Sequence, residues 1–122
     1  MAAKAYTVLV GLLLLVVGVL GLMGRVPLPT HHNWFHVVSG VIALLVAVAA
    51  SSHARTFAQI FGGIYALLAI LGFAGVANLG PLHLMLNAVP VLYVHSAVGL
   101  AGLLAGFLGK KKNETPQMKA AA

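Results

Sequence analysis

Histidine is the residue type in this sequence with the widest scope for chemistry. The chain has six histidines, and two of them, His36 and His95, each open a long apolar segment. A glycine follows each of these two histidines four positions later, at Gly40 and Gly99. A neutral imidazole is a good axial ligand for an iron or magnesium tetrapyrrole, and residues four apart share one helical face. The two histidines are therefore candidate ligands of haem or a chlorophyll-type pigment, with the two glycines clearing space for the flat macrocycle.

A packing interpretation competes with this ligand interpretation, and we favour it. In the packing interpretation, each histidine lies at the start of a helix and bonds to a loop carbonyl or to the other histidine, and the glycine lets another helix approach closely. His32 and His36 are four apart and could chelate a metal if the helix begins early enough. The pair His31-His32 is more typical of a hydrated loop, however, so no metal site is predicted. His83 is interpreted as an interfacial polar residue, and His53 together with Arg55 as a headgroup contact.

The absent residue types argue against an enzyme. The chain has no cysteine and a single acidic residue, Glu114, close to its end. It therefore offers no carboxylate pair, no Ser-His-Asp set and no Cys-His pair. Proton and cation pathways through membranes usually depend on embedded charged residues, which the apolar segments lack. We predict a non-enzymatic protein and disfavour a transporter that works alone.

The composition predicts an all-α membrane protein. Hydrophobic residues make up 61% of the 122 residues and charged residues 7%, whereas about a quarter of the residues in soluble proteins are charged. The mean hydropathy is +1.06. Segments of about 20 apolar residues cross a hydrocarbon core of roughly 30 Å. We predict a four-helix transmembrane domain over residues 1–109 and a polar basic tail over 110–122, with these spans: 6–24, 34–51, 57–77 and 90–108.

The segments between the spans differ in character. Pro27 and Pro29 remove backbone donors and favour a short loop after the first span. Residues 52–56 are too few for anything but a tight connection. Residues 78–89 contain an apolar cluster that is too short to span, which predicts an interfacial or re-entrant turn.

An internal repeat sets the expected topology. The pattern Leu-Gly-x-x-Gly ends the first span at residues 20–24 and recurs at residues 71–75, and the pattern His-x-x-x-Gly opens the second and fourth spans. This predicts two parallel helix-hairpin repeats, with His36 and His95 at similar depth.

The distribution of basic residues predicts the orientation. Six of the seven Lys and Arg residues lie on the side of the termini and of residues 52–56, and Arg25 alone lies on the other side. By the positive-inside rule, both termini are expected in the cytoplasm of a bacterial inner membrane. Contact with lipid headgroups is expected, above all for Lys110, Lys111 and Lys112, and nucleic acid is not an expected partner.

Small residues recur at helical spacing within the spans. Such rows let helices approach closely. They exceed what four helices can use among themselves, which predicts contact with another integral membrane protein, a second copy, a lipid or a pigment. The rows end at Gly24 and Gly75 in the first and third spans, and their members are Gly18, Gly21, Ser39, Ala43, Ala47, Gly72, Gly99, Gly102 and Gly106.

Residues 5–108 resemble a family of small bacterial four-span membrane proteins that is catalogued as a domain of unknown function. The resemblance implies the four-span architecture and no particular chemistry. An acidic residue often precedes the fourth-span histidine in that family, whereas this chain has Asn87 and apolar residues there. The matching motifs are His36-x-x-x-Gly40, Ala54-Arg55-x-x-Ala58-x-x-Phe61-Gly62 and Leu92-x-x-His95-x-x-x-Gly99.

These features together predict an accessory or scaffold subunit that packs against a larger respiratory or photosynthetic membrane complex. Two alternatives stay open: a haem- or chlorophyll-binding protein with His36 and His95 as axial ligands, and a small-solute transporter. A subunit would co-purify with a fixed partner, a pigment protein would lose its colour without either histidine, and a transporter would take up solute in liposomes.

Overall fold

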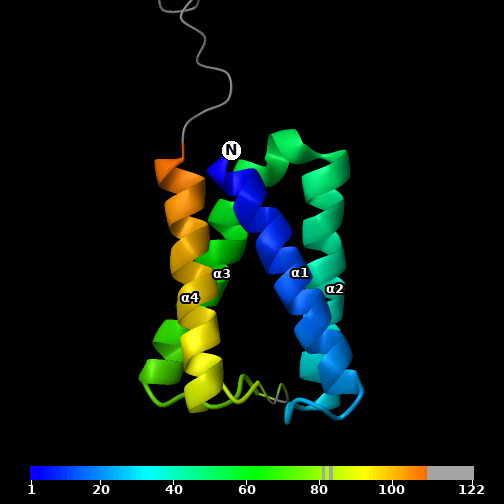
Figure 1. The fold of residues 1–122 in the computed structure, drawn as a ribbon. Helices are drawn as coiled ribbons and strands as arrows, with labels where there is room; N and C mark the ends of the chain where they lie inside the picture. Colours follow the sequence, from blue (N-terminus) through cyan, green and yellow to red (C-terminus); the bar gives the residue numbers. More distant parts are fainter. Residues whose placement is uncertain (81, 83, 110–122) are drawn as a thin grey trace, which may run out of the picture.

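A computed structural model describes residues 1–80, 82 and 84–109 of the chain. In this part of the chain each of the four α-helices is long and apolar enough to cross a membrane, which confirms the predicted four-span class (Figure 1). The predicted tail with Lys110, Lys111 and Lys112 lies outside the described residues, as does His83. The helices are α1 (Ala2–Leu22), α2 (Thr30–Ala49), α3 (Ala54–Phe73) and α4 (Val89–Leu108), and a short 3₁₀ helix, η1 (Ser51–His53), precedes α3.

All four helices begin before the predicted spans, α4 by a single residue. The largest consequence is in α2, which begins at Thr30, directly after Pro29, and not at residue 34. Pro29 has extended backbone geometry (φ −57°, ψ 147°), so the chain turns into the helix immediately after it. Hydropathy marks the part of a helix that crosses hydrocarbon, whereas the helix itself continues into the headgroup region with polar residues. The expectation that His31 and His32 lie in a loop is therefore wrong, since both are helical.

The repeated Leu-Gly-x-x-Gly pattern is a helix C-terminal cap. Gly24 and Gly75 have φ of +75° and +93°, a region that glycine enters at little cost. The N–H of the residue after each glycine donates to the carbonyl of the leucine that opens the pattern, at 2.8 Å in the first copy and 2.9 Å in the second. This is the Schellman arrangement. Gly24 and Gly75 thus end α1 and α3 and do not extend the small-residue rows.

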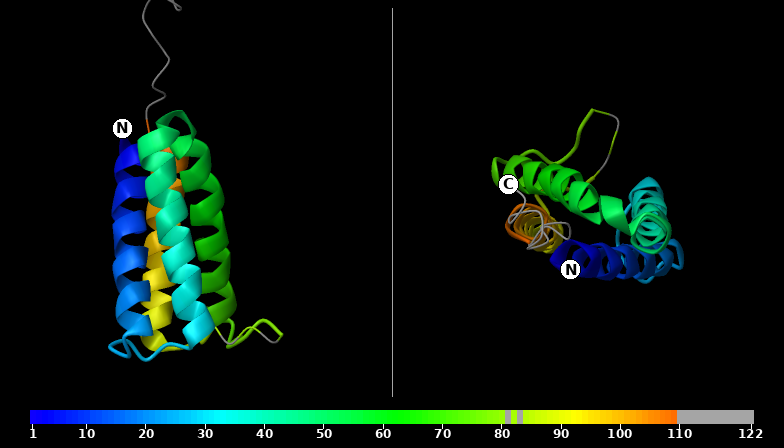
Figure 2. Two further views of the ribbon diagram at one scale, coloured as in Figure 1. Left: turned by 90° about the vertical axis from the view of Figure 1, so that its right-hand side faces the viewer. Right: turned by 90° about the horizontal axis from the view of Figure 1, so that it is seen from above.

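The helices form two antiparallel hairpins, α1 with α2 and α3 with α4, and most interhelical contacts lie within the hairpins. Helices α1 and α3 run in the same direction, which confirms the parallel repeat (Figures 1 and 2). The N-terminus, η1 and the end of α4 lie at one end of the bundle, called here the terminal end. The connection 23–29 and the described residues of the connection 74–88 lie at the opposite end, called the loop end.

The small-residue rows are used inside the chain. A Cβ atom on Gly40 would lie 2.7 Å from the Leu15 backbone nitrogen of α1, and one on Gly99 would meet the Ala66 backbone nitrogen of α3. The space beside both glycines is thus filled by backbone, so they do not clear room for a macrocycle. Backbone or side chains from other parts of the chain likewise lie against Gly18, Gly21, Gly72, Gly102 and Gly106.

The predicted small face of α2 is also mostly internal. Ala43 and Ala47 are buried, and Ser39 is half-buried. The surplus of small surface on which the expected partner rested is therefore not found at these positions.

Candidate metal centre

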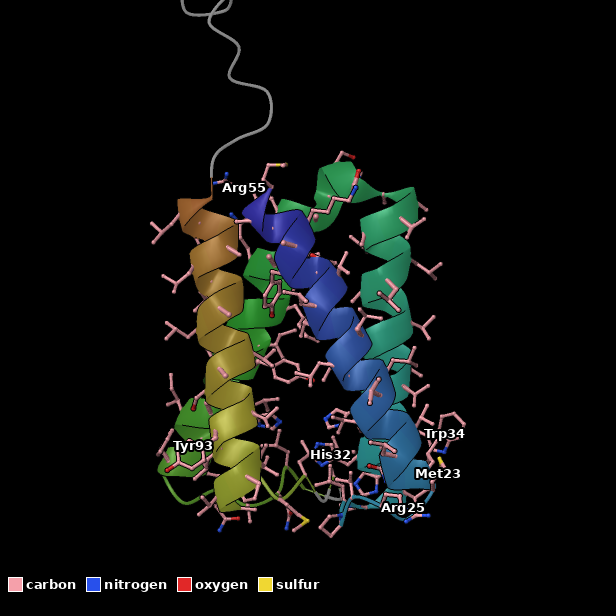
Figure 3. All side chains as sticks on the ribbon, viewed as in Figure 1. Met23, Arg25, His32, Trp34, Arg55 and Tyr93 are labelled. Atoms are coloured by element: carbon pink, nitrogen blue, oxygen red, sulfur yellow. The ribbon has the colours of Figure 1, made fainter. Side chains whose placement is uncertain are left out.

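Three histidine side chains converge between the two hairpins. His32 and His36 come from α2 and His95 from α4, and their exposed fractions are 3%, 5% and 3%. One ligand nitrogen from each histidine can be chosen so that all three lie within 4.8 Å of one another. We call these three residues the histidine cluster. It lies toward the loop end, where His32 points into the space between the hairpins (Figure 3).

The local sequence explains why the three side chains meet. Residues four apart share a helical face, so His32 and His36 point the same way from α2, toward the interior of the bundle. Their ring centroids are 4.6 Å apart. The repeat places His95 on α4 at the position that His36 holds on α2, and the centroid of its ring is 6.2 Å from that of His32.

The ring nitrogens of the cluster are poorly satisfied. Both ring nitrogens of His36 are buried with no hydrogen-bond partner among the described residues, and the same holds for Nδ1 of His32 and of His95. Burying a polar group without a partner costs free energy, so such groups need an explanation. The packing interpretation gave each histidine a bond to a loop carbonyl or to the other histidine, and the described part of the chain provides neither bond to His36.

The arrangement fits a small ion better than a macrocycle. Two axial ligands must hold a tetrapyrrole between them, whereas here a third imidazole, from His32, lies beside both His36 and His95. Three nitrogens that bind one ion at about 2.0–2.1 Å lie about 3.5 Å apart. The three histidine nitrogens lie within 4.8 Å of one another, so each would move toward the ion by less than about 0.8 Å. Side-chain rotations of that size would close the cluster around an ion.

Aromatic rings line the side of the cluster that faces the terminal end. The Tyr65 ring meets the His95 ring edge-on, with centroids 5.1 Å apart at 89°. Phe61 lies 4.6 Å from Tyr65, and Phe57 is stacked 4.9 Å beyond it along α3. An apolar shell of this kind orients a ligating side chain and keeps water from a site.

Helix α1 fastens the two hairpins together closer to the terminal end. The Tyr6 hydroxyl donates a 2.9 Å hydrogen bond to the Val98 carbonyl of α4. A Cβ atom on Gly102 would lie 2.6 Å from the Tyr6 hydroxyl oxygen, so the glycine leaves room for this bond. The position of His95, one turn earlier in α4, is thereby fixed relative to α1.

Two of the expected roles change in the structure. His32 was not predicted as a ligand, because the second helix was expected to begin at residue 34, after His32. The sequence signal that could have placed His32 in the helix is Pro29, immediately before Thr30. Arg55 was read with His53 as a headgroup contact, but its guanidinium donates to the carbonyls of Gly109 and Phe107 at 2.8 and 3.3 Å. It therefore caps the C-terminal end of α4, where a positive charge is favourable.

Other motif residues serve packing. Ala54, Ala58 and Gly62 are buried on α3. A Cβ atom on Gly62 would lie 2.7 Å from the backbone of Gly102 in α4. This motif therefore positions α3 against α4 and carries no reactive group.

A comparison with protein families finds that residues 24–108 match the model described as Domain of unknown function (DUF4383). The matched range holds all three members of the histidine cluster. No curated protein and no solved structure matches the chain.

Proposed function

We propose that this chain, which belongs to the family described as Domain of unknown function (DUF4383), is a small membrane protein that binds a metal ion through the histidine cluster. The observation that carries the proposal is the set of buried, unpartnered ring nitrogens, which converge within one ion's reach. Imidazole nitrogen suits zinc, copper, iron and nickel. A bound ion would give one of the two His36 ring nitrogens the partner that the described residues do not.

The proposal is for binding without turnover. Residues 1–109 contain no aspartate, glutamate or cysteine. General acid-base and nucleophilic catalysis depend mainly on such groups acting beside a histidine or an ion. An ion held between α2 and α4 would join the two hairpins, so its binding would stabilise the whole bundle.

We infer that the protein lies in a bacterial inner membrane with both termini in the cytoplasm. The excess of Lys and Arg at the terminal end supports this orientation. The histidine cluster, toward the loop end, would then lie near the outer surface of the membrane, where an ion can arrive from outside the cell.

The accessory-subunit hypothesis remains a prediction. Its original support was a surplus of small-residue surface, and the glycines concerned pack within the chain. A fixed protein partner that co-purifies with the chain from its native membrane would support this hypothesis. It is compatible with metal binding, since a subunit can carry an ion.

The proposal is tested by adding metal ions to the full-length protein, purified in mild detergent and stripped with a chelator. Zn²⁺, Ni²⁺, Co²⁺ and copper are added separately while thermal unfolding and bound metal are measured. We expect at least one of them to bind at one ion per chain and to stabilise the fold by about 2.7 kcal/mol at 100 times its dissociation constant.

The same measurement on His36→Ala and His95→Ala should show no stabilisation. His53→Ala is the matched control, because His53 is exposed and lies at the terminal end. Binding that survives in both cluster variants, or no stoichiometric binding of any ion, would contradict the proposal. A Soret or chlorophyll-type absorption band in the untreated protein would favour the tetrapyrrole alternative instead.

A further inference from the structure

We propose that the histidine cluster takes a monovalent copper ion, Cu⁺, in preference to divalent ions such as Zn²⁺. This inference rests on the proposed function and adds the charge of the ion to it. Ligand type alone does not decide the matter, because imidazole binds both metals well. The deciding feature is the charge around the cluster.

No negative charge is at hand to neutralise a bound cation. The charged side chains of residues 1–109 are all positive, and they are Lys4, Arg25 and Arg55. Arg25 lies at the loop end, the same end as the cluster (Figure 3). Three neutral imidazoles would therefore leave the full charge of the ion in place.

The burial of the cluster makes this uncompensated charge expensive. Each of the three histidines is at most 5% exposed, so the ion would have little contact with water. The free energy of moving an ion from water into a low-dielectric interior grows with the square of its charge, so it is about four times larger for a divalent than for a monovalent ion. The penalty therefore selects strongly against Zn²⁺.

The number of ligands points the same way. Within the described residues, the group of metal-ligating side chains holds three histidines. Zinc is almost always four-coordinate in proteins and would need water or hydroxide as its fourth ligand. Cu⁺ is satisfied by three nitrogen ligands, and the Tyr65 ring against His95 helps to exclude a fourth from solvent.

The first test compares affinities in the full-length protein in mild detergent without oxygen. The probes are Cu⁺ (kept monovalent by a reductant), the redox-inert monovalent ion Ag⁺, and Zn²⁺. Each ion is measured in competition with a chromophoric chelator of known affinity. We expect Cu⁺ and Ag⁺ to bind at one ion per chain and at least about 100-fold more tightly than Zn²⁺. Zn²⁺ binding as tight as that of Cu⁺ would overturn the charge argument and leave the proposed function standing, whereas no binding of any probe would overturn both.

A pair of variants isolates the effect of charge from the preferences of imidazole. Val91 is buried on α4 four residues before His95, so it shares a helical face with that ligand. Val91→Asp adds a carboxylate beside the cluster, and Val91→Asn is its uncharged control of the same shape. We expect the Asp variant to favour Zn²⁺ over Ag⁺ about tenfold more than the Asn variant does. Equal ion preferences in the two folded variants would contradict the inference, and if neither folds, the affinities of the unaltered chain decide it.

Discussion

At the scale of single residues, the burial of the His36 side chain needs an explanation. Its side chain is 5% exposed, and both ring nitrogens are buried without a hydrogen-bond partner in the described part of the chain. A merely structural histidine would be bonded, because buried polar groups nearly always are. Sites that bind ligands, by contrast, often carry groups that weaken the fold until the ligand arrives. His36 fits the second description.

This contrast gives a prediction for His36→Leu. Replacing a buried, unpartnered polar group by an apolar one of similar size removes a desolvation penalty of about 1–3 kcal/mol. We expect the ion-free variant to be as stable as the unaltered chain or more stable by that order, and to gain nothing from added metal. Thermal or denaturant unfolding in detergent measures both effects. A loss of stability in the ion-free variant would show that His36 has a structural bonding role.

The cluster was partly predictable at this scale. The repeat brings His36 and His95 to equivalent positions, and the sequence pattern alone indicated that. His32 was not predicted as a ligand because polar residues after two prolines are typical of a loop, and only the observed start of α2 at Thr30 places it on the buried face. The satisfaction of ring nitrogens depends on distant parts of the chain, so no sequence pattern reports it.

At the scale of the helices, glycine sets how closely each hairpin packs. A Cβ atom on Gly99 would meet the backbone of Tyr65 and Ala66 in α3. Because backbone cannot rotate aside as a side chain can, any larger residue there forces α3 and α4 apart. The equivalent residue in the other hairpin is Gly40, which meets the backbone of Leu15 and Gly11.

The prediction at this scale is that Gly99→Ala lowers the free energy of unfolding by about 1–3 kcal/mol, because one added methyl group overpacks the α3–α4 contact. Gly63→Ala is the matched control, since nothing lies within 4 Å of a Cβ atom at Gly63. There, better helix propensity should leave stability unchanged or raise it by up to about 1 kcal/mol. Unfolding of both variants in the same detergent gives the comparison, and equal losses in both would contradict the packing argument.

The helices themselves were predictable, because a four-span pattern needs only hydropathy and length. Their ends were not, because hydropathy follows the hydrocarbon region and not the hydrogen-bonded helix. The cap at Gly24 shows a second limit, since the sequence pattern was visible but was interpreted as part of a packing row. The pattern is recognised as a helix cap from the positive φ of Gly24, and a repeated sequence pattern does not report backbone φ.

At the scale of the whole molecule, the two hairpins share an apolar core, and polar groups bring them together at two further levels. Closer to the terminal end, the Tyr6 hydrogen bond to Val98 ties α1 to α4. Toward the loop end, the histidine cluster brings side chains of α2 and α4 together, and four of their ring nitrogens have no partner among the described residues. An ion in the cluster would therefore link α2 to α4, and the face of the membrane on which the cluster lies decides where the ion comes from.

The orientation can be measured directly, because the chain contains no cysteine. Met23→Cys places a thiol at the loop end, where Met23 is 64% exposed (Figure 3), and Ser52→Cys places one in η1 at the terminal end. Since basic residues are retained in the cytoplasm, a membrane-impermeant maleimide added to intact cells should label Met23→Cys and leave Ser52→Cys unlabelled. Lysis should then expose Ser52→Cys to the same reagent. The reverse pattern would place the loop end in the cytoplasm, and the ion bound by the histidine cluster would then have to come from inside the cell.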